Sequence, residues 1–96
     1  MNEQDFLRLL NEVIKLAKPF SGDMAEVSSM SEDLTAIGMD SLDLLITGVY
    51  LCDVLGIDEE TAKSVQAITP QTFYDILMAH KTREPSSVEE ALKEIQ

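Results

Sequence analysis

The chain has 96 residues, a net charge of -11, 45% apolar residues and 26% charged residues. This length permits one small domain with a single core and excludes a large enclosed active site. The strong acidity excludes a general role in binding nucleic acid or anionic membrane surfaces. Because there is no apolar run long enough to span a membrane and no signal pattern at the N-terminus, we expect a soluble, cytosolic protein.

A first helix is predicted from the N-terminus to no further than Phe20, where Pro19 and Gly22 end it. Asn2 is a suitable N-cap, with Asp5 at the third helical position. Apolar side chains recur at helical spacing and should form one buried stripe. These residues are Phe6, Leu9, Leu10, Val13, Ile14 and Ala17.

The connection from Ser21 to Asp40 is long for so small a domain. Apolar side chains are spaced along it, so we expect an ordered loop that packs on the core. These side chains belong to Met24, Val27, Met30, Leu34 and Ile37.

A second helix is predicted from about Ser41 to Leu55. Asp40 is a good N-cap, and Asp43 places another carboxylate in the first turn. Gly56 supplies the C-terminal stop, and Gly48 inside the helix indicates close approach of another helix or of a bound chain. Apolar residues recur at three- and four-residue spacing, which predicts a helix with one buried face: Leu42, Leu45, Ile46, Val49, Cys52 and Leu55.

Three shorter helices are predicted in the rest of the chain. The first begins with the acids 58–60 and reaches about Val65. Thr69 followed by Pro70 marks the next start, with Phe73, Ile76, Leu77 and His80 at helical spacing. The capping-box pattern 87–90 begins the last. Since no alternating strand pattern is present, the predicted fold class is all-α: a small four-helix bundle with a long first loop, a short third helix and an extra short C-terminal helix.

The acidic residues are unevenly distributed. Between Pro19 and Ala62 there are ten of them and no Lys or Arg, whereas the rest of the chain carries eight acids and all seven bases. Such a field steers basic protein partners toward the centre of this segment, where Ser41 lies. The alternative is an acidic surface kept for solubility.

The chain lacks the parts of an enzyme. A catalytic serine needs a base within hydrogen-bond reach, and the only histidine is His80. There is no Gly-x-Ser-x-Gly elbow and no glycine-rich phosphate loop. The single cysteine, Cys52, excludes an internal disulfide or a multi-cysteine metal site, and its place on the apolar face predicts a buried thiol. Ser41 is therefore expected to be a site of attachment, not a nucleophile.

The run Gly38-Met39-Asp40-Ser41-Leu42 resembles the prosthetic-group site of acyl carrier proteins. In that family an Asp-Ser-Leu segment opens the second helix, and the serine carries 4′-phosphopantetheine. The likeness extends from Glu3 to about Lys81, which implies an acyl carrier domain over residues 1–84 and a helical extension over 85–96. The matching residues are Leu34, Ile37, Gly38, Asp40, Ser41, Leu42 and Asp43.

The resemblance implies roles for particular residues. Ser41 would carry the covalent 4′-phosphopantetheine, with Asp40 and Leu42 beside it, and Asp40 would contribute a carboxylate to the magnesium site of the modifying transferase. Residues implied to bind partners are Asp43, Asp53, Asp58, Glu59 and Glu60. Residues implied to line an acyl pocket are Leu45, Val49, Ile68, Phe73 and Leu77.

The resemblance also implies the partners. They are a phosphopantetheinyl transferase and acyl-loading, condensing and modifying enzymes with basic docking surfaces, and the protein is expected to be a monomer. Fewer glutamates in the second helix and the added C-terminal segment suggest a carrier for a specialised lipid or polyketide-type product. The replaced positions are Ile46, Thr47, Tyr50, Cys52 and Val54.

Two other hypotheses stay open. An aminoacyl or peptidyl carrier shares the arm and the fold, although such domains often have Gly-Gly where this chain has Gly38-Met39. An unmodified acidic helical adaptor would keep the fold without the arm.

Overall fold

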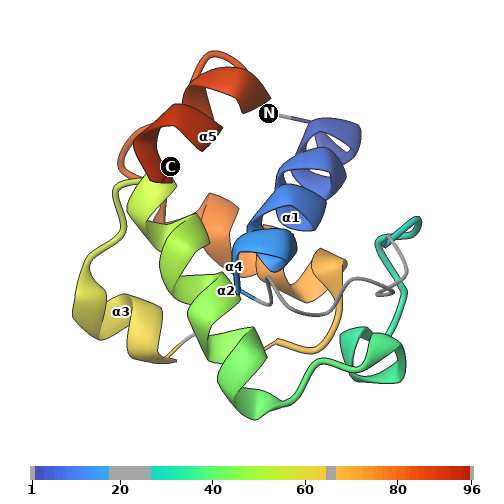
Figure 1. Ribbon diagram of the computed structural model, residues 1–96. Helices are drawn as coiled ribbons and strands as arrows, with labels where there is room; N and C mark the ends of the chain where they lie inside the picture. Colours follow the sequence, from blue (N-terminus) through green and yellow to red (C-terminus); the bar gives the residue numbers. More distant parts are fainter. Residues whose placement is uncertain (1, 18–26, 65–66, 96) are drawn as a thin grey trace.

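The protein was analysed as a computed structural model, which describes residues 2–17, 27–64 and 67–95 (Figure 1). These residues form five α-helices and one 3-10 helix and contain no strand, which confirms the all-helical class. None of these helices is both long and apolar enough to cross a membrane. The elements are α1 (Glu3–Ala17), η1 (Leu34–Ile37), α2 (Ser41–Val54), α3 (Glu59–Ser64), α4 (Pro70–His80) and α5 (Val88–Ile95).

Side-chain caps begin α1 and α4 where the sequence predicts them. The Asn2 Oδ1 atom accepts a hydrogen bond of 2.8 Å from the Asp5 N–H. The Thr69 hydroxyl accepts one of 3.2 Å from the Thr72 N–H, and Pro70 occupies the first helical turn. Each cap satisfies a backbone donor that has no partner inside its own helix.

The helices pack around a core formed mainly by α1 and α2. The predicted stripe of α1 is buried from Phe6 to Ile14, while the side chain of Ala17 lies outside the described residues. Phe73 and Leu77 of α4 are fully buried, and the Phe6 ring meets the Tyr74 ring edge to face at 5.3 Å. α4 contacts both α1 and α2, whereas α3 lies beside α2 at the edge of the bundle (Figure 1).

The first loop is held in place by hydrogen bonds to its backbone N–H and carbonyl groups. Both polar atoms of the Asn11 side chain bond to Val27: Nδ2 donates to its carbonyl at 2.9 Å, and Oδ1 accepts from its N–H at 2.7 Å. Further along, the Leu34 N–H donates to the Ile68 carbonyl at 2.7 Å. Val27 and Leu34 are buried and Met30 and Ile37 are half-buried, which confirms an ordered, packed loop; Met24 lies outside the described residues.

The C-terminal helix α5 packs on the same core as the other helices. Ser87 caps it by accepting a hydrogen bond of 3.1 Å from the Glu90 N–H. Val88 and Ala91 are buried, and α5 contacts both α1 and α2 (Figure 1). A helix this short is marginal alone in water, so its packing on α1 and α2 is what stabilises it.

The C-terminal end of α2 has the two hydrogen bonds of a Schellman motif. The Gly56 N–H donates to the Asp53 carbonyl at 3.3 Å, and the Ile57 N–H donates to the Cys52 carbonyl at 2.9 Å. Gly56 has φ +70°, in the left-handed region that this motif requires. A Cβ atom there would lie 2.3 Å from the Thr82 hydroxyl oxygen, so conformation and space both require glycine.

We therefore expect Gly56→Ala to lower the free energy of unfolding by at least about 1–2 kcal/mol, the cost of left-handed backbone in a residue with a Cβ. Gly48→Ala is the matched control. Gly48 is helical, and a Cβ there would lie 3.4 Å from Phe73 Cε1, an ordinary contact. The control should change stability by no more than about 1 kcal/mol, in the stabilising direction. Urea unfolding followed by circular dichroism measures both, and equal effects would contradict this reading.

Candidate functional site

Ser41 is the first residue of α2, and the preceding Asp40 caps the helix. The Asp43 N–H donates to Asp40 Oδ1 at 2.9 Å, and the Asp40 N–H donates to Asp43 Oδ2 at 3.0 Å. This reciprocal capping box fixes the first turn through residues on both sides of the serine. The predicted helix start and N-cap are confirmed.

The segment before Ser41 is anchored on its other side. Gly38, which has φ +101°, caps the C-terminal end of η1. The side chains of Leu34 in η1 and of Met39 after Gly38 are buried. At the start of η1 the Thr35 N–H donates to the Asp33 carboxylate at 2.9 Å. Hydrogen bonds from the Thr35 side chain and backbone lower the pKa of Asp33, so this cap is ionised at neutral pH. Anchored residues therefore precede and follow Ser41.

The side chain of Ser41 is exposed, and it makes no hydrogen bond with any other residue that the structure describes. The backbone N–H groups of Ser41 and Leu42 also have no hydrogen-bond acceptor among the described residues. They belong to the unpaired donors at the start of a helix. An anion attached to the serine oxygen would lie at the positive end of the α2 dipole.

An exposed apolar stripe begins beside Ser41 and follows α2. Leu42 is 60% exposed, Leu45 40% and Val49 41%, and their spacing of three and four residues places them on one face of the helix. The prediction that they belong to the buried face was wrong, because apolar spacing defines a face and does not show whether another helix covers it. Ile68, before α4, is 52% exposed. The three α2 side chains thus form an exposed apolar row on the surface of the helix.

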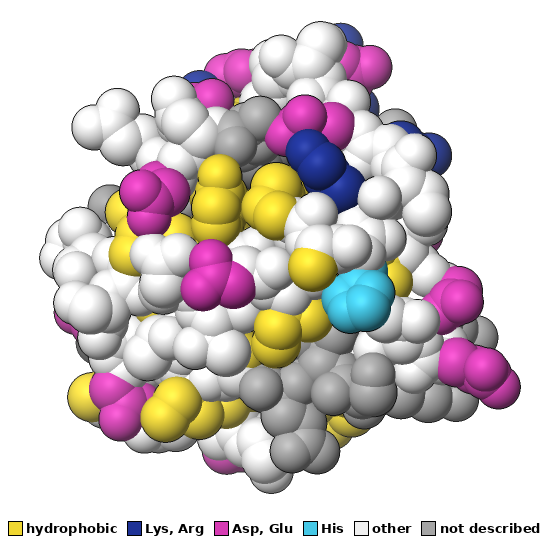
Figure 2. All heavy atoms as spheres, turned by 180° about the vertical axis from the view of Figure 1, so that it is seen from behind, with side chains coloured by type: hydrophobic (Ala, Val, Ile, Leu, Met, Phe, Trp, Pro, Cys, Tyr) yellow, Lys and Arg dark blue, Asp and Glu magenta, His cyan; other side chains and the backbone are white. Residues whose placement is uncertain are grey.

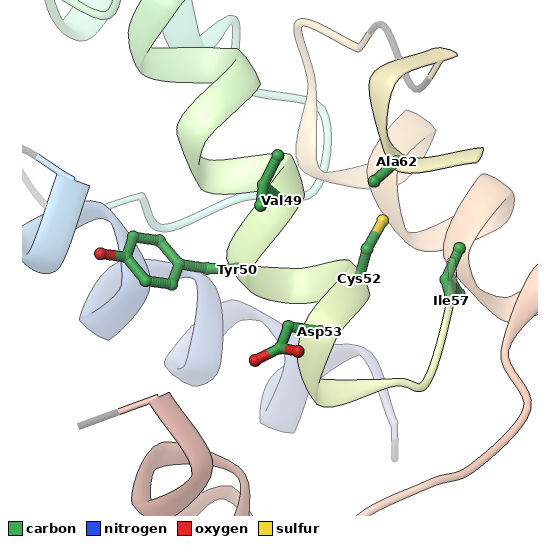
Figure 3. A pocket seen from close by; sticks show the side chains of 6 residues that line it. All are labelled: Val49, Tyr50, Cys52, Asp53, Ile57 and Ala62. Atoms are coloured by element: carbon green, nitrogen blue, oxygen red, sulfur yellow. The ribbon is translucent and has the colours of Figure 1, made fainter. Parts of the chain in front are cut away.

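A surface cavity of about 340 Å³, half open to solvent, lies at the end of this stripe, and α3 contributes Ala62 to its wall (Figure 3). Val49 belongs to both the stripe and the cavity. Eight residues of helix separate it from Ser41, a rise of about 12 Å. Tyr50 and Asp53 point away from α3 in this view. The lining residues are Val49, Tyr50, Cys52, Asp53, Ile57 and Ala62.

The five residues expected to line an acyl pocket do not share one environment. Phe73 and Leu77 are fully buried packing residues, whereas Leu45, Val49 and Ile68 are exposed. Val49 alone lines the cavity of about 340 Å³. The contributions of Ile57 and Ala62 were missed, because they depend on how the α2–α3 turn folds back.

The acids expected to bind partners also differ in placement. Asp53, Asp58 and Glu60 are exposed, while the side chain of Glu59 lies outside what the structure describes. Asp43 is buried, because its carboxylate turns back to cap α2. Asp43 therefore serves the helix start and presents little charge to a partner.

Asp58 has a structural role besides its exposure. Its carboxylate accepts a hydrogen bond of 2.7 Å from the Thr61 N–H and so caps α3. Hydrogen bonds from the Thr61 side chain and backbone, with a smaller effect of the charge on His80, lower the pKa of Asp58. The carboxylate is therefore ionised at neutral pH and contributes to the acidic surface.

Acidic and apolar groups are interspersed on the surface. Figure 2 shows one face on which hydrophobic side chains reach the surface among acidic ones, while the visible Lys and Arg side chains all lie in its upper half. That half is the end of the molecule at which α5 lies in Figure 1. On this face the basic side chains are thus confined to one half, whereas acidic side chains occur in both halves.

The α2 positions that differ from the carrier family face inward. Thr47, Cys52 and Val54 are buried, and Ile46 and Tyr50 are half-buried. The Thr47 hydroxyl has no hydrogen-bond partner among the described residues. These residues alter the packing of α2 more than the surface that it presents to a partner.

Cys52 is buried, as predicted, and Figure 3 shows its sulfur directed toward Ala62 of α3. Burial, with a smaller effect of the charge on Asp58, raises the pKa of the Cys52 thiol from 9.0 to about 11. The group is therefore a neutral thiol at physiological pH, unsuited to nucleophilic chemistry.

The site thus combines an exposed serine hydroxyl at a helix start, an apolar stripe and a cavity, set in an acidic surface. No protein-family model, curated protein or solved structure matches this chain. What the arrangement can do must therefore be argued from its own chemistry.

The Cys52 environment predicts slow reaction with thiol reagents. At pH 8 a thiol with a pKa of about 11 is ionised about a hundredfold less than one with a pKa of 9. Labelling by dithiobisnitrobenzoate should therefore be at least about a hundredfold slower in the folded protein than in urea, and faster as pH rises toward 11. Cys52→Ala, which has no thiol, is the negative control. Equal rates in the folded and unfolded protein would contradict the burial of this thiol.

Proposed function

We propose that the protein is an acyl carrier protein that bears 4′-phosphopantetheine on Ser41. The observation that carries this proposal is the position of Ser41: an exposed hydroxyl at the first residue of α2, held by the Asp40–Asp43 capping box. Within the described residues no side chain makes a hydrogen bond to this hydroxyl. Its surroundings suit a hydroxyl that another enzyme modifies.

The residues at the start of α2 fit the arm. The N–H groups of Ser41 and Leu42 would face a phosphodiester linked to the serine oxygen, and the α2 dipole would stabilise its charge. When attached, the arm would supply a distal thiol that holds the cargo as a thioester. The capping box keeps the attachment point at a fixed place on the surface.

Attachment is a phosphoryl transfer in which this chain supplies the acceptor. The Ser41 oxygen forms a bond to the phosphorus of coenzyme A that bears the pantetheine. The bond from that phosphorus to the bridging oxygen breaks, and adenosine 3′,5′-bisphosphate leaves. A base of the transferase takes the serine proton, because the described part of the chain places no base at this hydroxyl.

The stripe and the cavity favour an apolar acyl cargo. Leu42, Leu45 and Val49 lead from the attachment site to the cavity, where the Cys52, Ile57 and Ala62 side chains provide an apolar wall. Its volume of about 340 Å³ suits a short acyl chain better than a peptide. An aminoacyl carrier would need a polar group at the cargo end, and Asp53 is the only charged residue of the lining.

The surface around the stripe favours basic partners. Asp40, Asp53, Asp58 and Glu60 are exposed, and this part of the sequence contains no Lys or Arg. Exposed charges act through screened, long-range attraction, so binding should be fast, modest in affinity and sensitive to salt. These properties suit a carrier that visits a transferase and several acyl-processing enzymes in turn.

Incubation with coenzyme A and a broad-specificity phosphopantetheinyl transferase tests the proposal. Intact mass spectrometry should show the addition of one phosphopantetheine to the wild-type protein. Ser41→Ala should gain none, while the control Ser31→Ala, at an exposed loop serine, should be modified like wild type. An unchanged wild-type mass with several transferases would contradict the proposal and favour an unmodified acidic adaptor.

The role of Asp40 can be separated from its capping function. Asp40→Ala should lower the free energy of unfolding by about 1 kcal/mol and slow modification of Ser41, whereas Asp40→Asn keeps the cap. If the carboxylate contributes to the magnesium site of the transferase, Asp40→Asn should be as stable as wild type and still be modified slowly. A wild-type rate of modification in Asp40→Asn would remove that role.

A further inference from the structure

The α4–α5 connection, residues 81–87, crosses the C-terminal end of α2. The last carbonyl groups of a helix have no partner inside it. Here the N–H groups of Thr82 and Arg83 both donate to the Leu55 carbonyl, at 3.0 and 3.1 Å, and the Thr82 hydroxyl donates to the Gly56 carbonyl. A segment distant in the sequence thus satisfies acceptors where α2 turns toward α3.

The Arg83 side chain also donates hydrogen bonds to carbonyl groups at the end of α2. Its Nε donates to the Val54 carbonyl at 3.1 Å, and its Nη2 donates to the Asp53 carbonyl at 2.7 Å. The positive guanidinium thereby lies at the negative end of the α2 dipole. The absence of a Cβ at Gly56 lets the chain approach closely, since that atom would lie 3.0 Å from Arg83 Cγ.

One residue held in this way, Asp53, borders the cavity, and Ile57 directly follows Gly56, whose carbonyl accepts a hydrogen bond from Thr82. Asp53 and Ile57 both line the cavity, and α3 begins two residues after Ile57. α3 packs mainly on α2, and in the described part of α3 Ala62 is the one buried apolar side chain. A short helix with so little buried apolar surface separates easily from its neighbour. The α2–α3 turn is therefore one restraint on this wall of the cavity, and the Leu34–Ile68 hydrogen bond anchors the chain beyond α3.

We propose that Arg83 is a positioning residue that fixes the α2–α3 turn, holds α3 over the cavity and so controls how often the cavity opens. The consequence for cargo, slower exposure of the acyl group to water, rests on the proposed carrier function. The restraint on α3 is a property of the polypeptide and is present without the arm.

Cys52 is a built-in probe of this opening, because its sulfur is directed toward Ala62 and is shielded from solvent. The variants are Arg83→Gln, which removes the charge and the guanidinium fork, and Arg83→Lys, which keeps the charge alone. Arg8→Gln is the matched control: it removes a charge that pairs with Glu89 on α5 instead. Labelling of Cys52 and amide exchange would be measured on the unmodified proteins.

Arg83→Gln should raise the rate of Cys52 labelling and the exchange of the Thr61 and Ala62 amides by at least about tenfold, since it removes charge-assisted hydrogen bonds. Amides of the α1 core should change by less than about twofold, because α1 need not open. Arg83→Lys should be intermediate, and Arg8→Gln should behave like wild type. If amide exchange in Arg83→Gln accelerates equally in α1 and α3, Arg83 is only a general stabilising residue. If Cys52 labelling is unchanged, Arg83 does not hold α3. Either result overturns the proposal.

The cargo is tested separately with protein loaded from octanoyl-coenzyme A. Hydrolysis of the octanoyl thioester should be several-fold faster in Arg83→Gln than in wild type and in Arg8→Gln. If Ser41 cannot be loaded at all, the carrier function fails, while the labelling and exchange results on the unmodified chain still decide the role of Arg83. Loaded Arg83→Gln that opens faster but hydrolyses at the wild-type rate would show that the cavity does not shelter the cargo.

Discussion

The geometry of the site depends on how α2 is fixed at its two ends. At its start, Asp40 and Asp43 exchange hydrogen bonds across Ser41. At its end, a Schellman motif at Gly56 and the side chain of Arg83 satisfy the terminal carbonyl groups. Because α2 carries Ser41, the apolar stripe and most of the cavity lining, these two sets of hydrogen bonds determine where Ser41 lies relative to the cavity.

The charged groups at the two ends of α2 also have functional consequences. Acidic residues and a helix start surround Ser41, so an attached anion would be stabilised by the dipole and the site would attract basic proteins. At the other end the Arg83 guanidinium lies on the last carbonyl groups of α2. The exposed acids Asp53, Asp58 and Glu60 also lie near that end, so a basic partner would be attracted along the whole length of α2.

Local features of the fold were predictable from the sequence. Helix caps join residues two to four positions apart, so Asn2, Asp40, Thr69 and Ser87 could be recognised from spacing alone. The burial of the α1 stripe and of the first loop followed from apolar periodicity in the same way. The position of Ser41 at a helix start could be predicted from local spacing in the same way, and the functional hypothesis depends on it.

Contacts between distant segments were not predictable. Arg83 reaches carbonyl groups thirty residues earlier in the chain, and no periodic pattern encodes such a pairing. The cavity likewise depends on the turn that brings Ile57 and Ala62 beside Cys52. Phe73 and Leu77 are equally apolar but are fully buried in the core and do not line the cavity. Burial of Asp43 was missed because a first-turn acid serves either as a cap or as an exposed charge, and only the structure distinguishes them.

The central claim is that Ser41 is the one place on this chain where the arm is attached. Tandem mass spectrometry of proteolytic fragments from transferase-treated protein tests it most directly, because the segment before α2 contains further serines at 21, 28, 29 and 31. We expect phosphopantetheine on Ser41 alone. Its appearance on a loop serine, or its absence from every serine, would contradict the proposed role of Ser41.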